Sequence, residues 1–342
     1  MSLWSKRPGA RGQGPDAWGQ TPDAWSRRLA ASSEGPGARA VQAAAEKIRR
    51  GGLVAFPTET VYGLGANALD ESAVQKIYDL KGRPATSPLI VHVASIDMAR
   101  GIVAEWPALA EELARRWWPG PLTLVLPKRS EIPDIVTAGL PTVGVRMPSH
   151  PVALELIEAA GVPVAAPSAN RFTGVSPTTA EHVRAAFGDA VDVLDGGPCQ
   201  VGIESTVVAI QNGQLKLLRP GMLSLGDLEP QTAPSGEAHP APGMSARHYS
   251  PRTPVLLVAG PEALPDCRGA YVWRLKPASA ARTIRMPEDA AAYAARFYSV
   301  LHDLDAENRP WIAVELPPDT PEWAAIHDRL RRASTRVDGR EG

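Results

Sequence analysis

The chain has 342 residues, which predicts two domains because a single domain usually holds about 100–200 residues. Its 36 basic and 37 acidic residues nearly cancel, which argues against a protein that binds nucleic acid or membranes through its net charge. The two cysteines share no metal-ligand spacing, and no apolar run reaches about 20 residues, so we expect a cytoplasmic protein without a disulfide framework, a zinc site or a membrane partner.

Residues 1–36 are rich in Gly, Pro, Ser and Arg and have no sustained hydrophobic period. Such a composition predicts a mostly disordered extension. The phrase PDAW occurs twice in it, at residues 15–18 and 22–25. The repeat is interpreted either as a short partner-binding element or, as we favour, as part of a dispensable tail.

From residue 38 onward, predicted helices and strands alternate, as is typical of an α/β domain. The predicted helices cover residues 40–50, 71–80, about 107–117, 151–160 and 177–187, the last with Ser176 as its cap. The predicted strands cover 53–56, 89–93, 122–126, 142–146, 162–166, 191–194, 206–210 and 214–218. The last two strands flank Asn212-Gly213, a strong hairpin signal. We therefore expect one α/β domain over residues 37–225.

A second, smaller domain is predicted after a linker. Residues 226–253 are rich in Pro, Gly and small polar residues, as linkers are. The predicted strands that follow cover 255–258, 270–275 and 311–316, and the predicted helices cover 289–304 and 321–332. Residues 254–342 would then form a small α/β domain, and because they show no nucleophile or metal constellation, we expect a lid or an assembly module.

The stretch 51–83 holds the loop that the rest of the chain is organised around. Pro57 ends a short apolar strand, and small and hydroxyl residues follow. Asp70 is placed to cap the next helix, which Gly82 ends. The segment GLGANA superficially matches the dinucleotide fingerprint. However, ten residues lie between the strand end at Phe56 and Asn67, whereas the fingerprint requires a tight turn directly into the helix.

Cations recur at the ends of the predicted elements. Lys81 and Arg83, two apart in a predicted extended segment, can point the same way and hold a polyphosphate. Arg146 and Arg219 lie at predicted strand ends. Each arginine alone is more simply explained as a solvated or paired surface charge. Their recurrence beside hydroxyl-rich loops favours a site for a triphosphate and a carboxylate.

Polar residues recur in the same way. Ser168 and Asn170 follow the strand at 162–166, at the carboxyl edge where α/β sheets bind ligands. Ser176 is more simply a helix cap than a ligand group, although one residue can be both. His92 alternates with apolar neighbours, so it either faces a cleft or is a hydrogen-bonded core histidine, and the sequence does not separate these two interpretations.

General acid or base groups are harder to assign. Glu59 and Glu204 are candidate bases, but no paired carboxylate and no Ser/His/Asp spacing is present. Any catalysis would therefore depend on positioning and on stabilisation of charge. The sequence has no GKS or GKT segment, which argues against a P-loop ATPase.

Eight segments stand in a distinctive order. They are AFPTETVYGLGANA (55–68), KGRP (81–84), SPLIVHV (87–93), WPGPLTLVL (118–126), VGVRMPSHP (143–151), APSAN (166–170), DGG with GIESTVV (195–208) and LLRPG (217–221). Together they resemble the YrdC-like family of L-threonylcarbamoyladenylate synthases. The segment PGMSARHYSP at 242–251 and the trailing α/β domain resemble the two-domain branch of that family. The resemblance implies an α/β fold in which a twisted mixed-sheet YrdC-like domain precedes a smaller Rossmann-like α/β domain.

The resemblance also implies a reaction. Such an enzyme joins L-threonine, bicarbonate and ATP into threonylcarbamoyl-AMP and releases pyrophosphate. A threonylcarbamoyl-transferase complex would then move the threonylcarbamoyl group to the tRNA adenosine next to the anticodon. Mg²⁺ would bind together with the triphosphate and take no ligand from side chains.

The resemblance further implies a role for each matching residue. Those expected to hold L-threonine are Thr60, His92, Arg146 and Ser205. Those expected to hold ATP are Arg83, Ser87, Thr142, Ser168, Ser176 and Arg219. Those expected to form the catalytic cluster, which neutralises charge as a carbamate oxygen attacks the α-phosphorus, are Lys81, Arg83, Ser168 and Asn170. Arg146 would be the partner of the threonine carboxylate.

The linker departs from the pattern of two-domain relatives at one position. Those relatives often have a tyrosine shortly before the His-Tyr pair, where this chain has Ala246. Arg247 and Tyr249 are the candidates to replace its contact with the nucleotide. We expect the linker to fold over the cleft as a gate.

Three rival functions remain as alternatives. The main one is an RNA-binding module without catalytic activity, and the near-zero net charge and the lack of an aromatic-basic motif count against it. A carbamoyl-transfer domain like those in hydrogenase-maturation enzymes would need cysteine-rich fingers that this chain lacks. A dinucleotide-binding oxidoreductase is the third.

Overall fold

The computed structural model describes residues 36–226, 248–266 and 268–335. The expected disordered extension with its PDAW repeat and most of the expected linker, including Ala246 and Arg247, lie outside these residues. The chain divides into two units, Met1–Ala40 and Val41–Gly342, and both β-sheets belong to the second.

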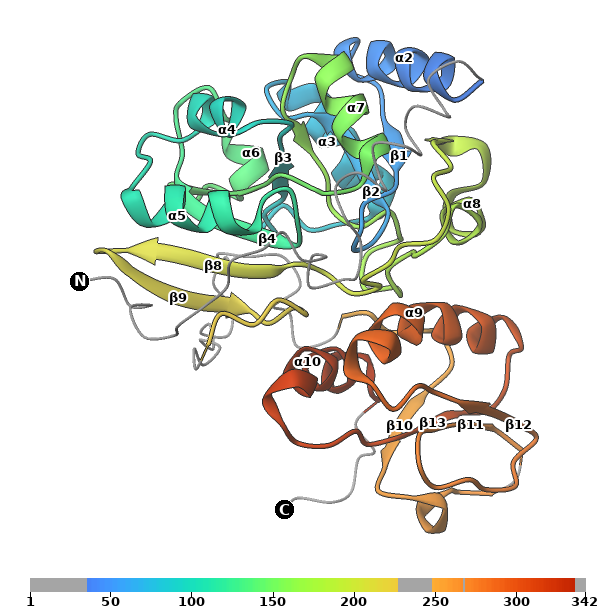
Figure 1. Ribbon diagram of the computed structural model, residues 1–342. Helices are drawn as coiled ribbons and strands as arrows, with labels where there is room; N and C mark the ends of the chain where they lie inside the picture. The colour runs from blue at the N-terminus through green and yellow to red at the C-terminus, as the bar shows by residue number, and fades with distance from the viewer. Residues whose placement is uncertain (1–35, 227–247, 267, 336–342) are drawn as a thin grey trace. The chain divides into compact units, whose positions relative to one another are not determined.

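The larger sheet has nine strands, in the order β7-β1-β2-β6-β3-β5-β4-β8-β9 (Figure 1). Its strands are β1 (Val54–Phe56), β2 (Gly63–Asn67), β3 (Ile90–His92), β4 (Leu122–Pro127), β5 (Thr142–Arg146), β6 (Val164–Ala165), β7 (Asp192–Val193), β8 (Thr206–Gln211) and β9 (Gln214–Arg219). The pairs β1·β7, β3·β5 and β4·β8 are parallel and the others are antiparallel. This arrangement confirms the expected α/β domain with a mixed sheet.

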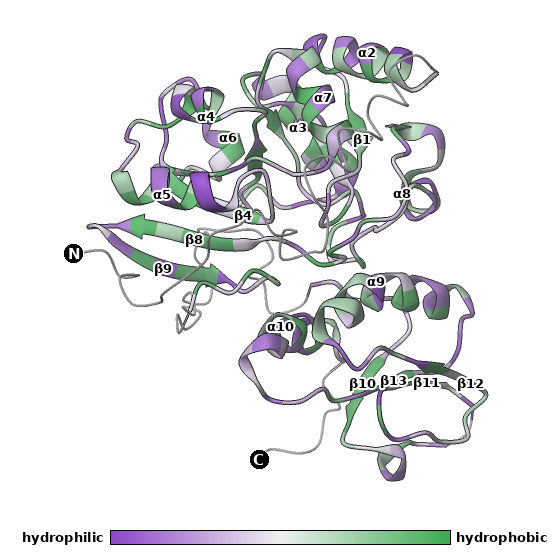
Figure 2. Ribbon diagram, in the orientation of Figure 1, coloured by the Kyte–Doolittle hydropathy of each residue, from purple (hydrophilic) through white to green (hydrophobic). Residues whose placement is uncertain are grey.

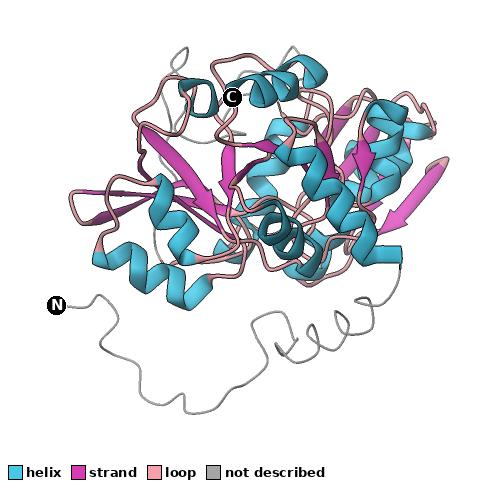
Figure 3. Cartoon of the chain, turned by 90° about the horizontal axis from the view of Figure 1, so that it is seen from above, coloured by secondary structure: helices cyan, strands magenta, loops and turns pink. Residues whose placement is uncertain are grey.

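Helices connect and cover these strands (Figure 3). They are α2 (Pro36–Arg49), α3 (Glu71–Lys81), α4 (Ile96–Ile102), α5 (Ala108–Trp117), α6 (Asp134–Thr137), α7 (Pro151–Ala160) and α8 (Ala180–Phe187). Asp70 caps α3 as predicted, because its carboxylate accepts from the N–H groups of Ser72 and Ala73, and Gly82 ends the helix at φ 64°. Within the described residues, no helix is long and apolar enough to cross a membrane.

Three local predictions were wrong. Residues 63–67, expected to be loop, form β2, which pairs antiparallel with β1 and β6. The helix expected to begin at Pro177, with Ser176 as its cap, begins at Ala180 and is capped by Thr179. Lys81 and Arg83 do not lie in an extended segment, because Lys81 is the last residue of α3 and Gly82 is left-handed. The short helices α4 and α6 were not predicted.

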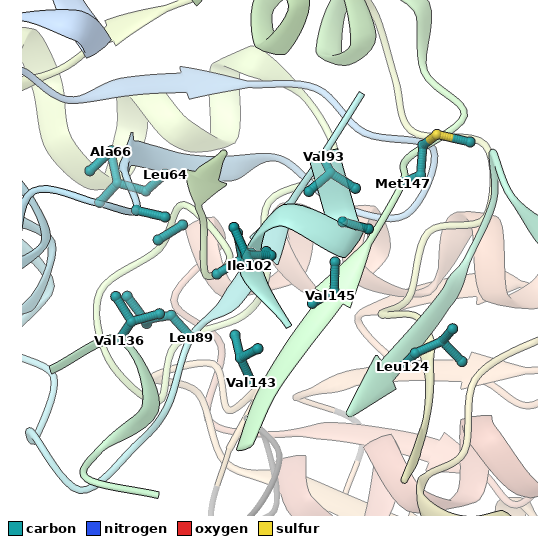
Figure 4. Close-up of a cluster of buried hydrophobic side chains, with 14 of the residues drawn as sticks. Leu64, Ala66, Leu89, Val93, Ile102, Leu124, Val136, Val143, Val145 and Met147 are labelled. Atoms are coloured by element: carbon teal, nitrogen blue, oxygen red, sulfur yellow. The ribbon is translucent and has the colours of Figure 1, made fainter. Parts of the chain in front are cut away.

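The central strands of the larger sheet are buried on both faces, and alternate residues of a strand point to opposite faces. Ala55 packs with α3, α4 and α5, whereas Val54 and Phe56 pack with α2 and α7. Figure 4 shows part of the first cluster, in which side chains of β2, β4 and β5 gather with Ile102 of α4 and Val136 of α6. The strands are mostly hydrophobic along their length, whereas helices such as α5 carry both kinds of residue (Figure 2).

The smaller sheet has four parallel strands, in the order β10-β13-β11-β12. They are β10 (Val255–Val258), β11 (Ala270–Trp273), β12 (Arg282–Arg285) and β13 (Ile312–Glu315), and β12 was not predicted. The helices α9 (Ala290–Ala306) and α10 (Ala324–Ala333) pack on this sheet through a shared core. Val61, Val175 and Ile203 of the first domain belong to the same core, so the two domains share buried apolar surface.

One glycine of the first domain closely approaches α9. Gly202 has φ 78°, and a β-carbon added there would lie 2.5 Å from Cα of Ala295. We expect Gly202→Ala to lower the free energy of unfolding by about 2–4 kcal/mol, because left-handed strain and a steric clash add. Gly161→Ala is the matched control, since Gly161 has φ 67° but no neighbour within 4 Å, and it should cost only about 1 kcal/mol. Equal losses in denaturant titrations of the two variants would contradict the close approach.

Candidate functional site

A pocket opens where the large sheet, the segment before β8 and the described end of the linker meet. Its wall contains eight of the residues to which the family resemblance points: Thr60, Arg83, His92, Arg146, Ser168, Ser205, Arg219 and Tyr249. Thr58, Glu204 and His248 also line it. The pocket's wall does not include Lys81, Ser87, Thr142, Asn170 or Ser176.

The first group in the pocket is built on parallel strands. β3 and β5 pair so that His92 lies beside Arg146. The Arg146 guanidinium forms an ion pair of 2.7 Å with Glu59 and donates from Nη1 to Oγ1 of Thr60 at 2.9 Å. Both side chains of the ion pair are about 5% exposed or less. Glu59 is therefore a buried partner of Arg146, and it also accepts the N–H of Ser149 at 3.1 Å.

Thr58 organises the loop that holds Thr60, and the sequence analysis missed it. Its hydroxyl donates to the carbonyl of Val61 at 2.6 Å and accepts the N–H groups of Thr60 and Val61, both at 3.2 Å. This ST-turn fixes the loop by local hydrogen bonds. The signal was present in the run Pro57-Thr58-Glu59-Thr60, where a hydroxyl residue follows a strand-ending proline.

His92 combines the two interpretations that the sequence left open, because it is buried and also lines the pocket. Burial, together with the nearby charge of Arg146, lowers its pKa to about 3. The ring is therefore neutral at physiological pH. Its Nδ1 has no hydrogen-bond partner among the described residues, so it can bond to a group that enters the pocket.

The buried histidines make the fold sensitive to acid. Burial is the main cause that lowers the pKa of His92 and His248 to about 3 and that of His302 to about 4, against 6.5 in the unfolded chain. Between pH 6.5 and pH 4 the unfolded chain therefore binds more protons than the folded chain. The free energy of unfolding contributed by the neutral histidines is complete above pH 6.5 and is lost as the pH falls toward 4. At pH 5.5 each histidine should cost about 1 kcal/mol.

Urea titrations test this sensitivity. We expect the free energy of unfolding to be about 3–4 kcal/mol lower at pH 5.5 than at pH 7.5. His302→Gln should reduce that difference by about 1 kcal/mol, because the amide does not titrate. A difference below 1 kcal/mol in the wild type would contradict the assignment of neutral, buried imidazoles.

A second positively charged group consists of Arg83 in the pocket's wall and Lys81 behind it. Arg83 donates from Nε to the carbonyl of Ser87 at 3.1 Å and from Nη2 to that of Pro88 at 2.9 Å. Burial lowers its pKa to about 10. Behind it, Lys81 donates to the carbonyls of Ser168 and Asn170, and burial with the charge of Arg83 lowers its pKa well below the usual value.

Lys81 and Arg83 are buried cations that donate to backbone carbonyl oxygens, and this arrangement requires a further explanation. Neither Lys81 nor Arg83 forms an ion pair with a residue in the described part of the chain, as the salt bridges of that part show. Holding charge in such a place costs free energy unless a counter-ion arrives. An anion bound in the pocket is the species that would supply it.

Ser205 is held by groups on two sides. Its hydroxyl lies 2.8 Å from that of Thr123, and it accepts from Nη2 of Arg219 at 3.1 Å. Arg219, the last residue of β9, also donates to the Ser205 carbonyl at 3.0 Å. The hairpin that ends in Arg219 therefore positions the residue that precedes β8.

Residues placed outside the pocket's wall differ in their surroundings. Asn170 donates to the carbonyls of Arg171 and Gly174 and so closes its own loop. Ser176, expected to be a helix cap, instead donates to Glu204 at 2.6 Å. Thr142 begins β5 and Arg146 ends it. Four residues of strand span about 13 Å, so a ligand that reaches both must be elongated.

Of the two linker candidates, only Tyr249 belongs to the described residues. It is 1% exposed, has φ 60° and lines the pocket. Its neighbour His248 packs edge-on against Phe172, with ring centroids 6.0 Å apart, and Phe172 lies beneath the guanidinium of Arg83. The described end of the linker therefore reaches the cationic part of the pocket.

Comparisons with known proteins give a consistent result. A Sua5/YciO/YrdC family model, described as "Telomere recombination", matches residues 46–221, and a model described as "Threonylcarbamoyl-AMP synthase, C-terminal domain" matches residues 210–335. A threonylcarbamoyl-AMP synthase of Pyrococcus abyssi is 50% identical over 233 residues, which cover 65% of this chain and 68% of that protein. One of Bacillus subtilis is 39% identical over 320 residues, which cover 85% and 92%.

A solved structure shows that the similarity includes the three-dimensional fold. The crystal structure of P. abyssi Sua5 complexed with L-threonine aligns with a TM-score of 0.82 at 40% identity, and the alignment covers 87% of this chain and 94% of that one. A variant of the same protein, with a histidine and the tyrosine after it replaced by alanine, aligns with the same TM-score at 39% identity. The match therefore spans both α/β domains.

Proposed function

The chain belongs to the Sua5/YciO/YrdC family, in the branch that carries the C-terminal domain of threonylcarbamoyl-AMP synthases, and we propose that it condenses L-threonine, bicarbonate and ATP to threonylcarbamoyl-AMP and pyrophosphate. The observation that carries this proposal is one pocket that joins Arg146, which already pairs with a carboxylate, to the buried Arg83, which has no ion pair among the described residues. The first part suits an amino acid and the second a polyphosphate.

L-Threonine is proposed to bind at the end of the pocket formed by β3 and β5. Arg146 would pair with its carboxylate, since a guanidinium matches a carboxylate with two parallel hydrogen bonds. The hydroxyls of Thr60 and Ser205 and the unpartnered Nδ1 of His92 are then the groups that would recognise its polar atoms. P. abyssi Sua5, whose structure contains L-threonine, supports this assignment.

ATP is proposed to bind at the cationic part. Arg83 and Arg219, with the hydroxyl of Ser168, would hold phosphate oxygens in the pocket, and Ser87, Thr142 and Ser176 would contact the nucleotide farther along it. Ser87 lies next to Pro88, which accepts from Arg83, and Thr142 lies at the same end of the parallel pair β3·β5. A nucleoside triphosphate is long enough to span the distance from Thr142 to Arg146.

The chain's own residues then account for the chemistry. A carbamate oxygen of the threonine adduct attacks the α-phosphorus, the bond to the β-phosphate oxygen breaks, and pyrophosphate leaves with the electron pair. Arg83 would stabilise the charge that develops on the phosphate oxygens. Lys81 would not contact the phosphate itself. By donating to the carbonyls of Ser168 and Asn170, it would fix the loop that borders the reacting phosphate.

Mg²⁺ is proposed to enter with the triphosphate. Among the described residues, no group of three or more His, Cys, Asp or Glu side chains could hold a metal ion, so phosphate oxygens would supply its ligands. Bound there, it would neutralise negative charge. We propose a cytoplasmic location and a threonylcarbamoyl-transferase complex acting on tRNA as the acceptor of the labile product.

Pyrophosphate release tests the proposed reaction. The purified protein should release pyrophosphate from ATP only when both L-threonine and bicarbonate are present, because the nucleophile forms from these two. Omission of either should reduce the rate to background. Release that is indifferent to both, or none from a folded protein, would overturn the proposal and favour the RNA-binding alternative, which a salt-dependent tRNA titration would then examine.

A further inference from the structure

An arginine of the C-terminal domain reaches into the wall of the pocket. Arg329 lies on α10 and is fully buried. Its Nε donates to Oε2 of Glu204 at 2.8 Å, and its Nη1 donates to the carbonyl of Pro220 at 2.8 Å. Glu204 and Pro220 both belong to the first domain, and each is the neighbour of a residue that lines the pocket, Ser205 and Arg219.

Glu204 connects this arginine to a second polar group. Its Oε1 accepts from Ser176 at 2.6 Å, and its Oε2 also accepts from Tyr298 of α9 at 3.0 Å. Burial alone would raise the pKa of this carboxyl, but the charges of Arg329 and Arg219 outweigh it and lower the pKa to about 2. Glu204 is therefore an anion that two cations and two hydroxyls hold in one position.

The same guanidinium also contacts the described end of the linker. Its carbon lies 5.3 Å from the ring centroid of Tyr249, which is a cation–π distance. Tyr249 is buried and lines the pocket. One side chain of the C-terminal domain thus touches three pieces of the pocket's surroundings that are far apart in the sequence.

Stability alone does not explain such an arrangement. A buried ion pair often contributes less than well-packed apolar residues of the same size, because both charges must leave water. An apolar pair in place of Glu204 and Arg329 could pack as well. Such a pair would not, however, fix the positions of the neighbouring Ser205 and Arg219 by hydrogen bonds.

We propose that Arg329 is a positioning residue through which the C-terminal domain sets the place of Ser205, Arg219 and Tyr249 for L-threonine binding. The inference rests on the proposed function, because that function makes Ser205 a contact of L-threonine. A purely structural latch would lower the amount of folded enzyme without changing the affinity of the folded fraction. A positioning residue changes the affinity itself.

The double variant Arg329→Met/Glu204→Gln separates these roles. It removes the cation and the anion together. Asp328, the other buried carboxylate that pairs with Arg329, keeps its ion pair with Arg332, so the protein should fold. We expect its KM for L-threonine to rise at least tenfold while kcat changes less than threefold, because the lost contacts serve the ground state and the transition state equally. Titration calorimetry with L-threonine should show the same loss of affinity.

Two further variants complete the experiment. Arg329→Lys keeps the charge beside Glu204 and should keep the KM for L-threonine within about threefold of the wild type. Arg331→Met is the matched control, since Arg331 lies two residues away on α10 with an exposed side chain, and it should leave the KM unchanged.

The outcomes distinguish the inference from the proposed function. A folded double variant with wild-type KM, or with only a lower kcat, would overturn the positioning role while an active wild type would leave the proposed function standing. A wild type that neither releases pyrophosphate nor binds L-threonine would overturn both.

Discussion

Arg83→Met is expected to stabilise the unliganded protein by about 1 kcal/mol and to lower kcat/KM for ATP by about 100-fold or more. Burial lowers the pKa of Arg83 from its usual range to about 10, so keeping this charge buried costs free energy in the unliganded protein. Loss of its two hydrogen bonds to carbonyls offsets part of that gain. The activity falls because the variant lacks the guanidinium that would bind the phosphate groups of ATP.

Denaturant titration and steady-state kinetics on the same preparation test both the expected gain in the free energy of unfolding and the expected loss of kcat/KM. Arg282→Met is the control, because Arg282 is half exposed and pairs with Glu307 on the surface of the second domain. That substitution should change the free energy of unfolding by less than about 0.5 kcal/mol and leave the kinetics unaltered. An Arg83→Met protein that is less stable and still active would contradict the assignment of an anion site.

Arg146→Lys is expected to raise the KM for L-threonine roughly 30-fold or more, while the KM for ATP changes less than threefold. Lysine retains the charge that Glu59 requires, so the buried carboxylate keeps a partner and the fold survives. The ammonium cannot, however, offer the planar fork that pairs with a carboxylate while a second nitrogen bonds to Thr60. A loss of about 2 kcal/mol in binding corresponds to roughly 30-fold.

Calorimetric titration of L-threonine measures this loss directly. Arg129→Lys serves as the control, since Arg129 is an exposed residue that donates to the carbonyl of Val103 away from the pocket. The affinity of the Arg129→Lys variant for L-threonine should stay within about twofold of the wild type. Equal affinities of Arg146→Lys and the wild type would mean that the carboxylate binds elsewhere.

Features with local causes were predictable from the sequence. α3 is set by Asp70 at one end and Gly82 at the other, and both signals lie within the helix's own neighbourhood. The hairpin β8·β9 follows from Asn212-Gly213, whose φ values of 51° and 71° are those of a tight hairpin turn. Arg146 could be placed at a strand end because β5 has the predicted bounds.

Features with tertiary causes were not predictable. β2 has glycines where a strand normally has branched residues, and the reason lies across the sheet, because a β-carbon at Gly65 would be 2.7 Å from Cε1 of Phe56. Ser176 follows the rule for a helix cap, but Glu204, 28 residues later, takes its hydroxyl. The contact of Arg329 with the pocket's wall needs the folded pair of domains and leaves no pattern in the sequence.

The most direct test is to incubate the protein with ATP, L-threonine and ¹³C-labelled bicarbonate and to identify the nucleotide product by mass spectrometry. The account predicts threonylcarbamoyl-AMP that carries one ¹³C atom, in amounts that match the pyrophosphate released. AMP or ADP without a labelled adduct, formed at the same rate whether or not L-threonine is present, would contradict it.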